Sequence, residues 1–441
     1  MFRNKMMLIV SSLVLVALTG VVRADETTDT RVASLEAQVA ELRAEKNGKW
    51  LNERRAEEIK GLMHEVLADA DTRASLLQDG AVAGHNGNHF FIGSADGAFL
   101  MQVFGQTQFR YNHMIDSTSS DETDSGFHLR RAKIGFKGHV QAGRKWDYTM
   151  ILGLDSTPAV SQDIEVYDVI VGTELKAGLR VDVGITTLPF LREELTDSSH
   201  QLAVERSLFN EFFSLNRSEQ IRFQYTPKDD LKIAVSISDG SNTGQTPNGG
   251  DAVDFAITTR VDWKVAGDWS QAADYTAWTG ESKAVFVGGA FHYQAGDGGN
   301  GNPSDYFAWT LDASLEMNKF GLAAAIAGAT IDPDSGADTD LFGVMVQASY
   351  LVKEDLEPFA RLEWMDDDSL DETVALTLGA NHYIKKHNAK FTLDVVMILD
   401  ADTSGLATNP MGTTTGGSPI GWAGGVGEDS AVVRAQLQLL F

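Results

Sequence analysis

The sequence predicts an all-β chain: a transmembrane antiparallel β-barrel of about sixteen strands, preceded by a short helical segment. Residues 431–441 alternate between apolar and polar side chains and end on the aromatic Phe441. Segments of this kind recur between residues 98 and 441, joined alternately by short turns and long polar loops. After residue 24, no apolar stretch approaches the roughly eighteen residues that a membrane-spanning helix requires. Any later membrane span must therefore be β.

Residues 1–24 are predicted to be a secretory signal peptide. Arg3 and Lys5 precede an apolar run over 6–22, and residues 22–24 offer compact side chains for cleavage before Asp25. The alternative is a retained membrane anchor. We favour cleavage, because the run is marginal for a span and lacks a basic flank after it.

Residues 25–80 are predicted to form a helical, coiled-coil periplasmic segment. Val32, Leu35, Val39 and Leu42 are spaced three, four and three apart, which is a seam of two heptads. Because two heptads are too few for an isolated coil, we expect the seam to form only after the barrel has gathered several copies. A second helical stretch, over 53–77, is either an oligomerisation element or a solvated spacer. Residues 81–97 are expected to be a linker and the start of the barrel.

From residue 90 onward the apolar period falls to two, which is typical of strands. Between Phe307 and Leu315 the odd positions are apolar, whereas Thr310, Asp312 and Ser314 are polar. The predicted strands cover residues 98–112, 127–141, 145–155, 163–175, 178–187, 218–227, 230–239, 251–264, 283–294, 304–316, 319–330, 340–351, 355–365, 372–385, 388–400 and 430–441.

The connections alternate in length, as in outer-membrane barrels with short periplasmic turns and long external loops. Long polar loops are expected at 113–126, 188–217, 331–339 and 401–429. The stretch 266–280 breaks the rule, because it is long where a short turn is due. We interpret it as an insertion.

Composition excludes several functions. The formal net charge of −26 disfavours nucleic acid as a partner. The chain has no cysteine, which excludes disulfides, thiolate metal sites, cysteine nucleophiles and a lipid-modified cysteine. The ten histidines show no metal-binding spacing, and the acidic stretch 332–340 lacks the late glutamate of a calcium loop. No Gly-x-Ser-x-Gly motif supports a lipid hydrolase. We expect no cofactor, no metal and no enzymatic activity.

Basic residues are predicted to line the lumen. If Ile134 and Phe136 face lipid, Arg131, Lys133 and Lys137 face inward on the same strand. The other predicted pore-lining bases are Arg110, Arg180, Arg222 and Arg260, joined by Arg361 and Arg434. The acids predicted to face them are Asp147, Asp182, Asp262, Asp312, Glu316, Glu363 and Asp394. Two interpretations stay open: an anion-selective ladder, or a transverse field of paired charges with little net selectivity.

Four segments resemble the phosphate-selective porin O and P family, in family order. Residues 90–97 running into 101–111 resemble its opening strand, and Gly126–Gly138 resembles its second strand. Residues 184–190 with 193–195 resemble its fifth strand and the loop start, and 205–207 resemble the loop that follows. The similarity covers about residues 90–238.

The resemblance implies a trimeric barrel of sixteen strands, in which the third external loop, 188–217, folds inward and narrows the pore. The charged constriction residues would then be Arg192, Glu193, Glu194, Glu205, Arg206 and Arg217. The chain departs from the family at Thr187, where a lysine is common. This departure predicts only a modest preference for phosphate.

Together these features predict a porin of the bacterial outer membrane, a passive diffusion channel for small polar or anionic solutes, phosphate among them. The expected partners are outer-membrane lipid, further copies of the chain in a homotrimer, and the barrel-assembly machinery, for which Phe441 is the assembly residue. The alternative is a structural anchor that tethers the cell wall through residues 25–80.

Overall fold

The computed structural model describes residues 80–87, 89–115, 125–155, 165–242, 253–295, 305–332, 338–367, 370–400 and 430–441. The predicted signal peptide and coiled-coil seam lie outside the described residues, as do most of the loops predicted at 113–126 and 401–429.

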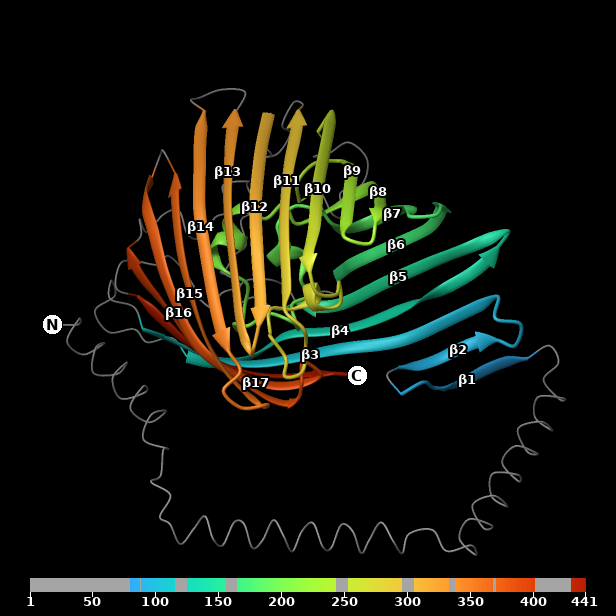
Figure 1. Cartoon of the computed structure of the whole chain (residues 1–441), viewed down its shortest axis with the longest axis horizontal. Coiled ribbons are helices and arrows are strands. Elements are labelled where there is room, and N and C mark those ends of the chain that lie inside the picture. The colour runs from blue at the N-terminus through green and yellow to red at the C-terminus, as the bar shows by residue number, and fades with distance from the viewer. Residues whose placement is uncertain are drawn as a thin grey trace, which may run out of the picture. The chain divides into compact units, whose positions relative to one another are not determined.

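Sixteen antiparallel strands of the described chain, β3 to β18, form a closed barrel (Figure 1). Each strand pairs with the next along the chain, and β18 pairs with β3 from Ala431↔Ile115 to Leu440↔Gln106, which closes the ring. The predicted all-β fold and strand number are confirmed. The strands are β3 Phe99–Ile115, β4 Ser125–Ala142, β5 Arg144–Asp155, β6 Glu165–Lys176, β7 Leu179–Thr187, β8 Arg217–Lys228, β9 Leu231–Ser238, β10 Phe255–Ala266, β11 Ala284–Ala295, β12 Asp305–Met317, β13 Phe320–Asp332, β14 Thr339–Tyr350, β15 Leu356–Asp367, β16 Leu370–Lys385, β17 Ala389–Asp400 and β18 Ala431–Leu440.

Side chains alternate between the two faces of the wall. In β12, Phe307 and Leu311 are exposed on the outside, whereas Thr310 and Glu316 are buried on the inside. A closed barrel satisfies its backbone hydrogen bonds between strands, so such an apolar outer face can contact hydrocarbon. No helix in the described part of the chain is long and apolar enough to cross a membrane.

The residues expected as a linker contain two short strands, β1 Ala81–His85 and β2 Phe90–Ser94. β2 pairs with the first part of β3, from Phe90↔Val103 to Gly93↔Leu100. β3 is longer than β18, so this stretch of its edge lies beyond the reach of the closing strand. β2 therefore covers an edge that would otherwise present unpaired backbone groups.

Two connections depart from the simple barrel pattern. Between β7 and β8, residues 188–216, called L3 below, contain the short helices α4 Arg192–Leu195 and α5 Leu208–Phe213. Between β10 and β11, residues 267–283 contain the 3-10 helix η1 Gln271–Ala273. This second segment lies at the end of the barrel that carries the short turns, which is the periplasmic end in outer-membrane barrels. It is called the periplasmic insertion below.

Phe441 completes the seam between the last strand and β3. Its backbone N–H donates to the Gly105 carbonyl at 3.1 Å, and its carbonyl accepts from the Gly105 N–H at 2.7 Å. The ring lies over Gly105 on the outer face, where a Cβ would come within 2.4 Å of it. The aromatic terminus therefore needs a glycine opposite it.

We expect removal of Phe441 to lower the folded outer-membrane fraction, because two seam hydrogen bonds and an outward aromatic ring are lost together. Heat-modifiable mobility of the membrane fraction on gels measures this. Phe441→Tyr is the matched control and should assemble normally. Equal folded amounts with and without Phe441 would show that the residue is dispensable.

Candidate functional site

L3 folds into the barrel because its short helix α5 is apolar on the side that meets the wall. Phe209 and Phe213 are buried in the main core cluster, and a Cβ at Gly343 of β14 would come within 2.6 Å of the Phe213 ring. Ser207 caps α5, accepting from the Asn210 N–H at 2.8 Å. Figure 1 shows the green L3 segment inside the ring of strands.

A single carboxylate ties the tip of L3 to the wall. Glu205 forms ion pairs with Arg110 at 2.5 Å, Arg130 at 2.6 Å and Arg131 at 2.9 Å, and all four side chains are buried. Burial alone would raise the pKa of Glu205, but the three guanidinium groups hold it well below its usual value. The carboxylate therefore stays ionised and holds the three arginines together.

Arg130 was missed by sequence reasoning, because strict alternation places it on the lipid face next to Arg131. A β-bulge shifts the register at this point: Gln108 pairs with Arg131 and Phe109 with Leu129, so Arg130 has no residue opposite it. A bulge re-aims a side chain, and here both arginines turn inward. The available signal was the adjacent Arg-Arg pair, since a charged side chain on the lipid face is costly.

Other ion pairs fix L3 to the strands near the closing seam. Arg361 of β15 pairs with Glu363 at 2.9 Å and Glu193 of L3 at 3.5 Å. Asp394 of β17 pairs with Arg434 at 2.8 Å and also accepts the N–H of Val204 at 2.9 Å. The loop is therefore held along β15–β18 by buried charges.

Several charged side chains of the opposite wall stay partly exposed. Arg180 of β7 lies between Asp147 and Asp182, at 2.7 Å from each, and its side chain is 32% exposed. Arg222 of β8 lies 3.8 Å from Asp182 and is 15% exposed. Gly172 of β6 makes this row possible, because a Cβ there would overlap the Asp182 carboxylate at 1.8 Å. The row of paired charges runs across β5–β8.

Lys133 and Lys137 of β4 continue this accessible wall. The Lys133 ammonium lies 3.9 Å from the centre of the Tyr167 ring, and Lys137 lies 5.1 Å from that of Phe104. Arg217, at the start of β8, pairs with Asp168 at 3.4 Å. Arg217 was predicted within the loop, but the structure places it on the strand, directly opposite Thr187.

The structure separates the predicted pore-lining bases into two groups. Lys133, Lys137, Arg180 and Arg222 face the accessible part of the lumen. Arg110, Arg131 and Arg260 are buried, which corrects their expected place on an open pore surface. The correction has one cause: L3 contacts each of these three arginines. Arg260, for example, pairs with Asp312 at 2.8 Å and donates to the Phe190 carbonyl at 2.6 Å.

The remaining predicted loop residues lie within L3 or against its neighbours. Arg192 donates to Ser314 of β12 and lies 5.3 Å from the centre of the Tyr275 ring. Glu194 forms an ion pair with Arg206 at 3.3 Å and accepts from the Asn210 amide at 2.8 Å. Arg206 also donates to carbonyls within α4 and at its end. These contacts make L3 compact rather than extended.

A closed barrel of sixteen strands with an inward third loop is the fold of outer-membrane porins, and solved structures share it. An anion-selective porin from Comamonas acidovorans matches with a TM-score of 0.58 and 15% identity over 77% of this chain and 99% of that chain. The Salmonella typhi OmpF complex with daunomycin matches with a TM-score of 0.54 and 13% identity, covering 82% of this chain and 100% of that one. The outer membrane channel DcaP of Acinetobacter baumannii gives a TM-score of 0.51 with 10% identity, covering 78% and 99% of the two chains.

Residues 102–274 match the family model described as phosphate-selective porin O and P, which confirms the resemblance drawn from the motifs. An uncharacterized protein from Aquifex aeolicus is 25% identical over 245 residues, which are 49% of this chain and 59% of that protein. The chain thus spans less than two thirds of that relative. The matched segment and the shared fold thus relate the chain to outer-membrane porins.

We expect Glu205→Gln to destabilise the folded barrel by about 3 kcal/mol, because three buried arginines lose their anionic partner. The midpoint of urea unfolding measures the loss. Glu194→Gln is the matched control in the same loop, since Glu194 pairs with one arginine only. Equal losses for the two variants would contradict a special role for Glu205.

We expect the anion preference to rise as the pH falls through neutrality. Burial and the neighbouring Glu194 and Glu205 carboxylates raise the pKa of Glu211 in α5 to about 7. Glu211 is therefore charged above that pH and neutral below it, so acidification removes a negative charge from the constriction. Reversal potentials between about pH 8 and pH 6 measure the effect. Glu211→Gln should flatten the dependence, and an unchanged slope in that variant would exclude Glu211 as its source.

Proposed function

We propose that the protein is a passive diffusion channel whose water-filled passage runs along the β4–β9 wall. The observation that carries this proposal is the contrast in exposure between the two sides of the lumen. Arg180 is 32% exposed on the β7 side, whereas Arg434 and Asp394 on the closing side are 0% exposed. L3 packs on the closing side, so the accessible charges on the other side border the space through which solutes pass.

The charges of this wall favour small anions over cations, but only weakly. The partly or fully exposed basic residues of this wall include Lys133, Lys137, Lys145, Arg180, Arg217, Arg222 and Lys232, and the acids near them include Asp147, Asp168, Glu174 and Asp182. Many of these groups are paired, so they orient polar solutes more than they attract one sign of charge.

Phosphate is proposed as one permeant anion rather than as a tightly bound one. The lysine that is common in the family is absent at Thr187, whose carbonyl lies 3.5 Å from the Arg222 guanidinium. Arg217 lies opposite Thr187 but is engaged by Asp168. Saturable block of chloride current by micromolar phosphate would contradict this proposal.

We also propose a homotrimer in the outer membrane. One of the similar barrels, OmpT of Vibrio cholerae, has been solved in a trimer form, with a TM-score of 0.51 and 11% identity to this chain. The apolar outer face provides the surface through which barrels can associate. Sedimentation of the detergent-solubilised protein tests the stoichiometry, and a monomer would contradict it.

We expect Lys137→Gln combined with Arg180→Gln to shift the reversal potential toward cation preference at low salt. The two changes remove accessible positive charge and leave Asp147 and Asp182 less compensated. Each charge in a wet pore contributes on the order of 1 kcal/mol, so conductance in molar salt should stay within about twofold of wild type.

The matched control for this pair is Lys228→Gln combined with Lys353→Gln, two exposed lysines at the short-turn end of the barrel. The control should leave the reversal potential unchanged. An equal shift in both double variants would contradict the assignment of the passage to the β4–β9 wall. A wild-type protein with no steady current in planar bilayers would instead favour the structural anchor.

A further inference from the structure

The periplasmic insertion enters the lumen, although the other six connections between barrel strands at its end of the described chain are short. Tyr275, Thr276, Ala277 and Trp278 are all buried, and none of them belongs to a strand. Thr276 donates to Glu357 of β15 at 3.1 Å and lies 3.1 Å from the Tyr383 hydroxyl of β16. Both partners point inward from the wall, so the insertion occupies the barrel interior.

The insertion crosses from one side of the barrel to the other. At its start, the Trp269 indole N–H donates to the Asp229 carbonyl at 2.7 Å, and the Lys232 ammonium lies 4.1 Å from the ring centre. Further along, Asp274 accepts from His387, between β16 and β17, at 2.9 Å. The segment therefore joins the β8–β10 side to the β16–β17 side.

The contact with His387 is a hydrogen bond between a neutral ring and a carboxylate. Burial lowers the pKa of His387 to about 4, so the imidazole is neutral at neutral pH. Asp274 is mostly buried too, but the hydrogen bonds from His387 and Trp278 lower the pKa of its carboxyl below the usual value. The bond is thus charge-assisted and persists at neutral pH.

The insertion is stacked directly on L3. The Tyr275 ring belongs to one buried cluster with Leu202 and Ala203 of L3 and Phe359 of β15. The rings of His200, in L3, and His387 are 4.6 Å apart. The two segments therefore form one continuous packed body, built from opposite ends of the barrel.

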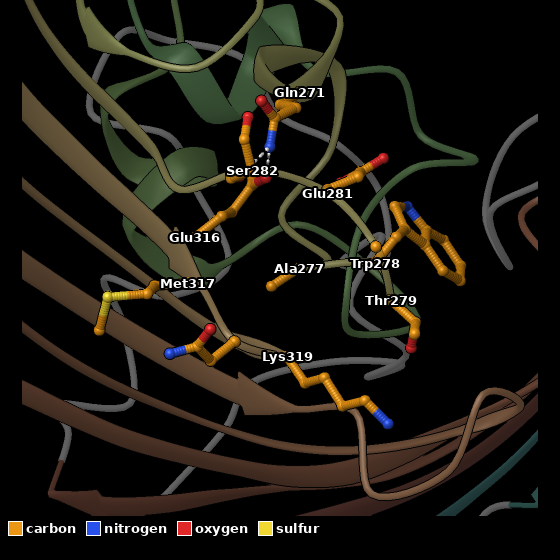
Figure 2. A pocket seen from close by; sticks show the side chains of 11 residues that line it. Gln271, Ala277, Trp278, Thr279, Glu281, Ser282, Glu316, Met317 and Lys319 are labelled. Carbon is orange, nitrogen blue, oxygen red and sulfur yellow. Dashed lines mark hydrogen bonds between the residues drawn. The ribbon is translucent and has the colours of Figure 1, made fainter.

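The insertion does not lie flat on the wall. Figure 2 shows Gln271 reaching Glu316 of β12, while Trp278 and Lys319 border a cleft of about 400 Å³ between the insertion and the β12–β13 turn. The Gln271 amide donates to the Ser282 carbonyl at 2.9 Å and to Glu316 at 3.3 Å, which links the two arms of the segment. It is thus a folded element with its own internal contacts.

We propose that the periplasmic insertion is a second constriction element, which together with L3 sets the size limit of the passage. The inference rests on the proposed channel function. Tyr275 and Trp278 are its positioning residues: Tyr275 seats the segment under L3, and Trp278 packs on Tyr383 with ring centres 4.8 Å apart. Because the buried contacts of Tyr275 and Trp278 lie with L3 and the β15–β16 strands, we expect solutes to pass on the opposite side, along the exposed part of the β4–β9 wall.

The experiment replaces residues 268–282 by an Asn-Gly turn, which matches the other short connections. Liposome swelling with sugars of increasing size measures the exclusion limit, and planar bilayers measure conductance. We expect larger sugars to pass and conductance in molar salt to rise about twofold, because the lower constriction is gone.

A second variant, Tyr275→Ala combined with Trp278→Ala, keeps the chain length. It tests the inference if the shortened chain does not assemble. It should shift the exclusion limit in the same direction, whereas Ser270→Ala combined with Thr279→Ala, at exposed positions of the same segment, should not.

The inference is overturned if the exclusion limit does not change in the shortened chain. If only the double alanine variant assembles, an unchanged limit in that variant has the same meaning. In both cases a steady wild-type current would still support the proposed channel function. A wild-type protein without current would overturn both together.

Discussion

The interior of this barrel depends on the pairing of Glu205 with three arginines. A carboxylate and three guanidinium groups taken out of water are stable only when each charge finds a partner. Two of the arginines reach the carboxylate because a bulge in β4 turns consecutive residues inward. The position of L3 therefore depends on the buried charges, and the buried charges depend on the bulge in β4.

The two sides of the lumen use charge differently. On the closing side, arginines and carboxylates are removed from water and serve to attach L3, as Arg361 does with Glu193. On the β4–β9 side, pairs such as Arg180 with Asp147 remain hydrated, so they are available to a passing solute. The same residue types thus attach the loop on one wall and stay partly exposed on the other. Coverage by L3 decides which role each one has.

The barrel itself could be predicted from the sequence, because the period of two and the turn residues act locally along each strand. The strand predicted at 178–187 is observed as Leu179–Thr187, and that predicted at 388–400 as Ala389–Asp400. Alternation also predicted which side chains turn inward, for example Lys133 and Arg180. It failed at Arg130, where a bulge breaks the period.

Exposure and the inserted segments could not be predicted in the same way. Alternation says that Arg110 and Arg260 point into the lumen, but only the path of L3 across the barrel shows that they are buried. The length of the connection at 266–280 could be read from the sequence. Its partners Glu357 and His387, however, are roughly a hundred residues away in the chain. Such contacts depend on closure of the whole ring, which no local pattern encodes.

The proposed off-centre passage would change how salt acts on permeation. In a wide central pore, an ion can stay farther from the wall than the screening length, which is about 8 Å at physiological ionic strength. A solute pressed against β4–β9 by L3 and the insertion remains in near contact with groups such as Lys137 and Arg180. Dissolved ions then have little room between the solute and these wall residues. In the proposed passage the wall charges would therefore act on solutes at shorter range than in a wide central pore, so salt would screen them less.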